Sequence, residues 1–157
     1  IPLPVSTKPP QYVDIYIKYL LYALVRTEGE DQVTYKRIES PCDPKPLHLR
    51  VDNMSLDKLK TSVINRLRHM SKRYPFDFIA FRAEQGGILT WKYGITEYPT
   101  MVEDYRLAHL DTATMPDFIE TATNTWLPDK VWVSVIMLKQ AKHSHPASIV
   151  TILVSAF

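Results

Sequence analysis

Glycine is scarce in this sequence, with four among 157 residues: Gly29, Gly86, Gly87 and Gly94. A loop that cradles phosphate groups needs glycines between a strand and a helix, because its backbone N–H groups must approach the anion closely. No glycine stands in such a place here, and the adjacent pair Gly86-Gly87 is expected to form the turn of a β-hairpin. Catalysis that depends on a bound nucleotide is therefore not expected in its common forms.

Cysteine and long apolar runs are also rare. The single cysteine, Cys42, rules out an intramolecular disulfide, and its place in the proline-rich loop 41–46 favours an ordinary loop thiol over a nucleophile. The longest apolar stretches, 131–138 and 149–157, are far shorter than the ~20 residues of a membrane-spanning helix. The sequence thus predicts no transmembrane segment and favours an intracellular location, either cytoplasmic or organellar, or a place inside a virion.

No catalytic or metal-binding motif is present. His143 and His145 are the only close histidine pair, but no cysteine or acidic residue nearby completes the set of about four ligands that a metal site needs. A nucleophile elbow of the G-x-S-x-G type is absent. We therefore predict a protein that is not an enzyme and that has neither metal nor cofactor. An enzymatic role would need His109 or His143 and a carboxylate brought together in a cleft.

Hydrophobic periodicity predicts one α+β domain, residues 12–157, behind an extended proline-rich arm, residues 1–11. Apolar patterns predict strands at 12–25, 33–38, 47–51, 76–82, 88–95, 131–138 and 148–156, and helices at 55–73 and from residue 114 onward. The expected fold is a mostly antiparallel sheet of about six or seven strands with two or three helices packed on it.

Residues 76–82 are expected to form a central strand, since both faces of this stretch are apolar, and to pair with 88–95 in a hairpin. Residues 101–110 are expected to be a short helix or an irregular segment. The order of elements over 12–95 is similar to that of the ubiquitin-like β-grasp superfold. This likeness rests on element order alone, so it implies no function.

An amphipathic helix with a basic outer face is the strongest signal in the sequence. At 100° per residue, its apolar side chains fall within one arc of about 80°. Five cations gather on the opposite side: Lys58, Arg66, Arg68, Lys72 and Arg73. Segment 55–73 contains six Lys or Arg and one Asp, a net charge of +5, which leaves −3 for the rest of a chain whose total is +2. This asymmetry predicts contact with an anionic surface; the alternative is a solvated helix face.

The segment Pro9-Pro10-Gln11-Tyr12 matches the PPxY pattern that WW domains bind. A preformed polyproline segment loses little entropy on docking, while the tyrosine fills a second groove. Pro9, Pro10 and Tyr12 are therefore the candidate partner-binding residues. The motif also resembles the late-budding motifs of enveloped-virus matrix proteins, which carry PPxY near the N-terminus, ahead of a compact α+β core with basic patches. The alternative is a structural arm that enters the sheet, since Tyr12 adjoins the predicted strand.

Together these features predict a non-catalytic structural or interaction protein that works within a larger assembly. The arm would bind a neighbouring protein, such as a WW-domain protein, and the basic helix would face an anionic membrane surface or a nucleic acid. A viral matrix-like protein and a processed subunit of an organellar complex are two concrete versions; a leader removed before Ile1 would favour the second. The alternative is an RNA-binding domain that uses the basic helix, with Tyr74 as an aromatic neighbour of the charges.

Overall fold

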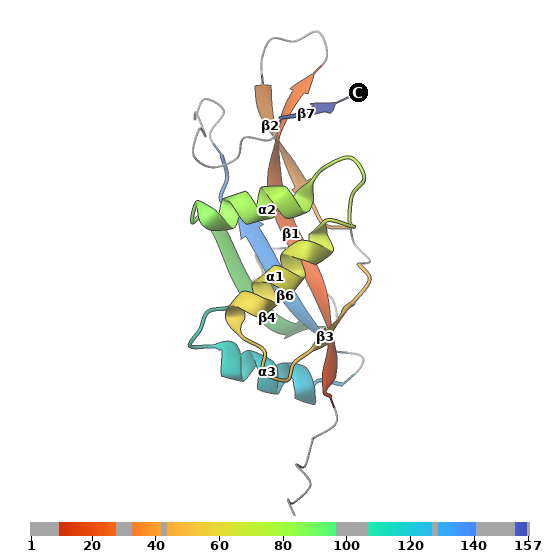
Figure 1. Ribbon diagram of the computed structural model, residues 1–157, viewed down its shortest axis with the longest axis vertical. Coiled ribbons are helices and arrows are strands. Elements are labelled where there is room, and N and C mark those ends of the chain that lie inside the picture. Colours follow the sequence, from red (N-terminus) through yellow and green to blue (C-terminus); the bar gives the residue numbers. More distant parts are fainter. Residues whose placement is uncertain are drawn as a thin grey trace, which may run out of the picture.

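A computed structural model of the protein describes residues 10–27, 33–41, 44–96, 107–126, 129–140 and 153–156. These residues form a seven-stranded, mostly antiparallel sheet with three helices, so the predicted α+β class is confirmed (Figure 1). The strands are β1 Tyr12–Thr27, β2 Val33–Glu39, β3 Leu47–Arg50, β4 Leu89–Thr96, β5 Ala108–His109, β6 Lys130–Met137 and β7 Leu153–Ala156. The helices are α1 Leu56–Leu67, α2 Phe76–Gln85 and α3 Met115–Asn124.

Strand β1 organises the sheet because four other strands pair with it. Antiparallel strands β3 and β2 follow one another along one of its edges. Parallel strand β6 pairs with residues 15–20 on the other edge, and parallel strand β7 pairs farther along with residues 24–27. Strands β4 and β5 extend the sheet beyond β6, which gives the order β2-β1-β6-β4-β5. The predicted strands at 12–25, 33–38, 47–51, 88–95 and 131–138 are all present, each within about two residues of its predicted bounds.

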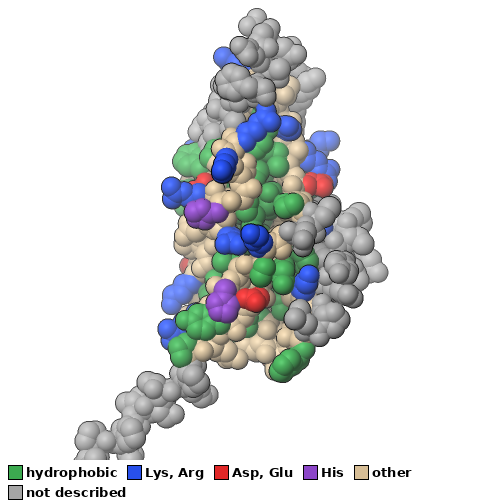
Figure 2. Space-filling model, turned by 90° about the vertical axis from the view of Figure 1, so that its right-hand side faces the viewer, with side chains coloured by type: hydrophobic (Ala, Val, Ile, Leu, Met, Phe, Trp, Pro, Cys, Tyr) green, Lys and Arg blue, Asp and Glu red, His purple; other side chains and the backbone are tan. Residues whose placement is uncertain are grey.

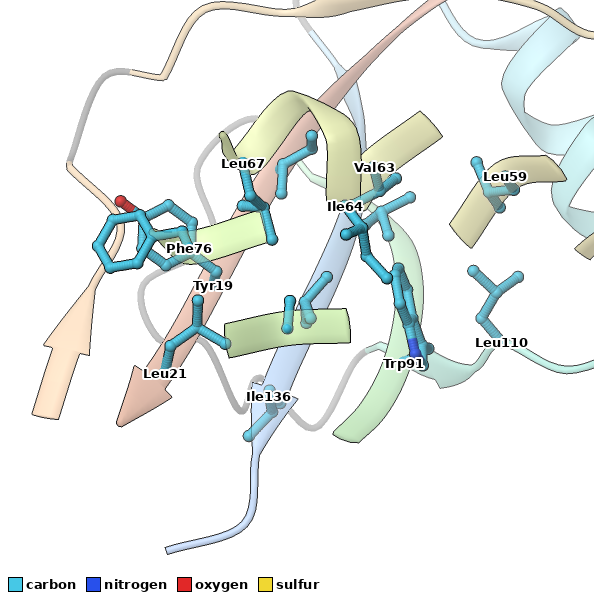
Figure 3. Packing of buried hydrophobic residues seen from close by; sticks show 14 of the residues in the cluster. Tyr19, Leu21, Leu59, Val63, Ile64, Leu67, Phe76, Trp91, Leu110 and Ile136 are labelled. Atoms are coloured by element: carbon cyan, nitrogen blue, oxygen red, sulfur yellow. The ribbon is translucent and has the colours of Figure 1, made fainter. Parts of the chain in front are cut away.

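The hydrophobic core lies between the sheet and the helices. Odd-numbered residues of β1, such as Ile15 and Ile17, are fully buried on the face that the helices cover, as the alternation of a strand requires. Figure 3 shows Tyr19 of β1 beside Phe76 of α2, and their ring centroids are 5.1 Å apart. Burial raises the pKa of Tyr19 above its ordinary value. These contacts fix α2 on the middle of the sheet.

The prediction of a central strand at 76–82 is wrong, because these residues form the first part of α2. Phe76, Ile79, Ala80 and Ala83 are buried at the i, i+3, i+4, i+7 spacing of one helix face. Phe78 and Phe81 point away from that face and are 46% and 49% exposed. The apolar residues that suggested two buried strand faces therefore belong to one buried and one exposed side of a helix.

Gly86 and Gly87 end helix α2 and do not form a hairpin turn. Gly87 has a φ of +72°, the left-handed conformation that favours glycine after a helix. The N–H of Ile88 donates to the carbonyl of Ala83 over 3.1 Å, and the N–H of Gly87 donates to that of Glu84. This is the hydrogen-bond pattern of a Schellman motif, which satisfies the last carbonyls of the helix and turns the chain into β4.

Helix α1 begins where the sequence predicts but ends at Leu67, six residues before the predicted end at Arg73. The Ser55 hydroxyl caps the start by accepting a hydrogen bond from the N–H of Lys58. After the helix, the Ser71 hydroxyl accepts the backbone N–H groups of both Arg73 and Tyr74. A serine that captures these donors competes with a continuing helix, so the chain turns at residues 68–75 and brings Phe76 into the core.

Helix α3 starts as predicted, with Pro116 in its first turn. Its buried Phe118 meets the ring of Tyr93 from β4 edge to face, with centroids 5.6 Å apart. The Tyr93 hydroxyl donates a hydrogen bond to the carboxylate of Asp117. Burial of the hydroxyl and, to a lesser extent, the nearby carboxylate raise the pKa of Tyr93 to about 12. Trp126, which fits the helical spacing in the sequence, lies beyond the end of α3 and is 83% exposed.

The remaining predictions fall partly outside the described residues. These are residues 1–9 of the arm, Cys42 and Asp43 of the proline-rich loop, residues 101–106, and residues 148–152 of the last predicted strand. Within the described part, residues 108–109 form the two-residue strand β5, where the sequence predicted a short helix or an irregular segment.

Candidate functional site

Four of the five cations predicted to bind an anionic surface lie at one end of helix α1. Arg66 is in its last turn, Arg68 is the C-terminal capping residue, and Lys72 and Arg73 lie in the connection to α2. Arg68, Lys72 and Arg73 are exposed. Positive charge is favourable at a helix C-terminus, where the unpaired carbonyls carry partial negative charge. The dipole therefore accounts for the placement of Arg66 and Arg68, but not for the two further cations in the connection.

The ring of Tyr74 brings a further cation to the same place. The Lys36 ammonium, from strand β2, lies 5.9 Å from the centre of this ring, and the Arg73 guanidinium lies 5.4 Å from it. Tyr74 itself is buried and stacks on Phe76 with centroids 5.7 Å apart. Two segments far apart in the sequence thus contribute cations to one surface. We call it the basic cluster, and its members are Lys36, Arg66, Arg68, Lys72 and Arg73.

No member of the basic cluster forms an ion pair with a carboxylate among the residues that the structure describes. Arg66 instead approaches the backbone carbonyl of Pro46, with its Nη2 at 3.5 Å. Lys60, the neighbouring cation of α1, differs, because its ammonium lies 2.7 Å from the carboxylate of Glu84. Glu84 also accepts a hydrogen bond from the indole N–H of Trp91, so this pair links α1, α2 and β4. The cluster charges are therefore available to an external anion, whereas the charge of Lys60 is compensated within the fold.

Lys58 does not belong to the basic cluster. It lies in the first turn of α1, and its ammonium donates to the carbonyl of Asn53 over 3.2 Å. Eight residues of helix separate it from Arg66, a distance along the axis of about 12 Å. The five cations that the sequence grouped on one helix face are thus divided, and Lys58 stands apart at the opposite end of α1.

Lys36 is the member of the cluster that the sequence did not predict. The alternation of the predicted strand 33–38 places it on the same side as Thr34 and Ile38. That pattern marks a cation on the helix side of an edge strand, but it cannot show that the connection 68–75 passes over the strand. The contact depends on long-range packing through Tyr74 and Phe76.

Basic side chains are spread over one side of the molecule. Figure 2 shows Lys and Arg side chains along its whole height, with only a few Asp and Glu side chains between them. The total charge of the chain is only +2, so this face carries more positive charge than the composition of the whole chain would suggest.

The described part of the PPxY segment is fixed at the start of the sheet. The backbone N–H of Gln11 donates to the Asp52 carboxylate over 3.0 Å, and the backbone carbonyl of Gln11 accepts a hydrogen bond from the N–H of Val51. The Arg50 hydrogen bond and the Gln11 N–H hold the pKa of Asp52 below its ordinary value, against the opposing effect of desolvation. Pro10 is exposed, and Pro9 lies outside the described residues.

Tyr12 is the first residue of β1 and pairs with Arg50 of β3. Its ring stacks on His48, with centroids 4.9 Å apart and planes 6° from parallel. The His48 imidazole in turn contacts the carboxylate of Asp14 over 2.7 Å. Tyr12 is nevertheless 49% exposed, so it belongs to the sheet and is displayed at the same time.

The structure places one of the two histidines on which an enzymatic role was predicted to depend. No group of three His, Cys, Asp or Glu side chains in the described ranges could hold a metal ion. His109 lines a cavity of about 640 Å³ on the sheet face away from the helices, together with Arg37, Lys92 and Lys139. No carboxylate lines this cavity. His143 and His145 lie outside the described residues.

Comparison with known proteins finds no relative. No protein-family description, no curated protein and no solved structure matches this chain. Within the described residues, no helix combines the length and the apolar character that crossing a membrane would require. The basic cluster and the PPxY segment are thus the features from which a function can be inferred.

Proposed function

We propose that this protein is a non-catalytic building block of a larger assembly, and that it docks on an anionic surface through the basic cluster. The observation that supports this proposal is the convergence of five cations from two segments, none of which has a carboxylate partner among the described residues. Each Lys or Arg near an anionic lipid surface contributes about 1 kcal/mol. Five such groups supply enough free energy for reversible docking by a protein of low net charge.

The docking proposal can be tested with vesicles and salt. Wild-type protein is expected to sediment with vesicles that contain about 30 mol% phosphatidylserine at about 0.05 M NaCl, and to be released at about 0.5 M, because salt screens exposed charges. Vesicles of phosphatidylcholine alone are the control and should bind little. Absence of binding to the anionic vesicles would contradict docking on a membrane.

The alternative anionic partner is RNA, and the burial of Tyr74 counts against the version of it in which bases stack on this ring. Proteins that bind single-stranded RNA stack bases on accessible aromatic rings among the cations. Tyr74, the aromatic residue at the centre of the basic cluster, is 8% exposed, so its ring cannot receive a base. Binding to a single-stranded RNA with a steep salt dependence, without binding to vesicles, would nevertheless replace the membrane by a nucleic acid as the partner.

For the arm we propose a WW-domain protein as the partner, because the PPxY tyrosine remains half exposed at the sheet edge. Tyr12→Ala is expected to eliminate binding of a WW domain in a calorimetric titration, since the tyrosine fills one of the two grooves. His48→Ala is the matched control: it removes the ring that stacks on Tyr12 but leaves the motif intact. Unchanged affinity of the Tyr12→Ala variant would remove the WW-domain proposal.

A further inference from the structure

Helix α2 carries two large apolar side chains on its outer surface. Phe78 and Phe81 are 46% and 49% exposed, although the side chains on the opposite face of the same helix are buried in the core. Residues three apart on a helix are neighbours, with Cβ atoms about 5–6 Å apart. The two rings therefore form one exposed apolar patch, the Phe78/Phe81 pair, where a water-facing helix normally carries polar side chains.

The Phe78/Phe81 pair lies next to the basic cluster. Helix α2 follows directly on the connection that holds Lys72 and Arg73, and Phe78 is in its first turn. Helices α1 and α2 pack side by side on the same face of the sheet (Figure 1). The outer surfaces of the two helices and the connection between them thus form a continuous layer, with cations at the turn and aromatic rings immediately after it.

We propose that this layer is a membrane-docking surface, in which the Phe78/Phe81 pair enters the boundary between head groups and acyl chains of an anionic bilayer. The inference rests on the proposed docking function and adds the apolar contact that selects lipid over other anionic partners. Interfacial helices use the same combination of an apolar face and flanking cations, which bind the lipid phosphates. Asp77 is a carboxylate in the first turn of α2, where its negative charge interacts favourably with the positive N-terminal end of the helix dipole.

The shape and chemistry of the surface favour a bilayer over a nucleic acid or a protein. Single-stranded nucleic acid binds in a charged groove that follows its backbone, whereas the Phe78/Phe81 pair lies on the convex surface of a helix. A bilayer needs no matching groove, because the acyl region adapts its shape to any inserted side chain. The cations beside the pair are complementary to anionic head groups.

The first test measures vesicle binding of the double variant Phe78→Ala/Phe81→Ala. Its affinity for phosphatidylserine-containing vesicles is expected to be about a hundredfold lower than that of the wild type. Each phenyl ring that is removed loses the free energy of its transfer from water into the bilayer, which corresponds to about a tenfold loss of affinity. Leu138→Ala is the matched control. Leu138 is 65% exposed, but it lines the cavity on the sheet face away from α1 and α2, so its replacement should leave vesicle binding unchanged.

The outcomes separate this inference from the docking proposal. Wild-type binding together with equal binding of the double variant would leave electrostatic docking in place and overturn insertion of the Phe78/Phe81 pair. Absence of wild-type binding to any vesicle would overturn both. Wild-type binding to RNA that the double variant loses, without vesicle binding, would identify the rings as a stacking surface and overturn the bilayer.

A second measurement reports insertion directly. A nitroxide attached to Phe81→Cys in a Cys42→Ser background is expected to become accessible to oxygen and protected from a water-soluble nickel chelate when the protein binds anionic vesicles. Cys42 is the only cysteine of the chain, so the label has a single site. The same label at Leu138→Cys is the control and should stay accessible to the nickel chelate. A label at residue 81 that remains accessible to the chelate on bound protein would overturn insertion.

Discussion

Phe76→Ala is expected to lower the free energy of unfolding by about 3–5 kcal/mol, whereas Phe78→Ala, two residues along, should change it by less than about 1 kcal/mol. Phe76 is 2% exposed and packs against the rings of Tyr19 and Tyr74, so its removal opens a cavity in the core. Phe78 is 46% exposed and loses few packed neighbours. Urea unfolding followed by circular dichroism measures both values.

This pair of variants also discriminates between helix and strand at 76–85. In the strand predicted from the sequence, residues two apart lie on the same face, so Phe76 and Phe78 would share one environment. Truncating either residue to alanine would then lower the free energy of unfolding by a similar amount. In helix α2 they point about 160° apart around the axis. Equal losses of stability for the two variants would therefore contradict the helix, and with it the exposed position of the Phe78/Phe81 pair.

Strands β1, β2, β3, β4 and β6 could be predicted from the sequence because their patterns have one interpretation, whereas the two-residue strand β5 is too short to give a pattern. Strand β1 begins with a strict alternation, and β6 is rich in Val and Ile and is buried along almost its whole length. Residues 76–81 contain apolar side chains at positions that fit a period of 2 as well as a period of 3.6, and a run this short does not decide between them. The glycines after it were equally ambiguous, since a hairpin turn and a helix C-terminus both require a left-handed residue.

The candidate site could be predicted only as far as its local part. Arg66, Arg68, Lys72 and Arg73 are close in sequence, so any fold that exposes this segment keeps them together. The cluster is completed by Lys36, which lies about thirty residues earlier and approaches Arg73 only through the ring of Tyr74. The position of such a residue depends on the pairing of β2 with β1 and on the end of α1 at Leu67, and neither is encoded in local periodicity.

Reversing three charges of the basic cluster is expected to have the largest effect on function. The triple variant Arg68→Glu/Lys72→Glu/Arg73→Glu should bind anionic vesicles at least about a thousandfold more weakly than the wild type, since each reversal removes an attraction of about 1 kcal/mol and adds a repulsion. All three side chains are exposed, so the fold should tolerate the changes. Sedimentation at low salt measures the loss, and circular dichroism verifies the fold.

A control of equal charge separates a docking face from general electrostatic attraction. Arg37→Glu/Lys92→Glu/Lys139→Glu changes the net charge by the same amount, but these residues line the cavity on the sheet face away from the helices. If docking is directed, this variant retains most of its vesicle binding, because its reversed charges face away from lipid that contacts α1 and α2, and salt screens their repulsion across the sheet. Equal losses in the two triple variants would mean that binding follows net charge alone. The basic cluster would then contribute no more to docking than other basic residues of the surface.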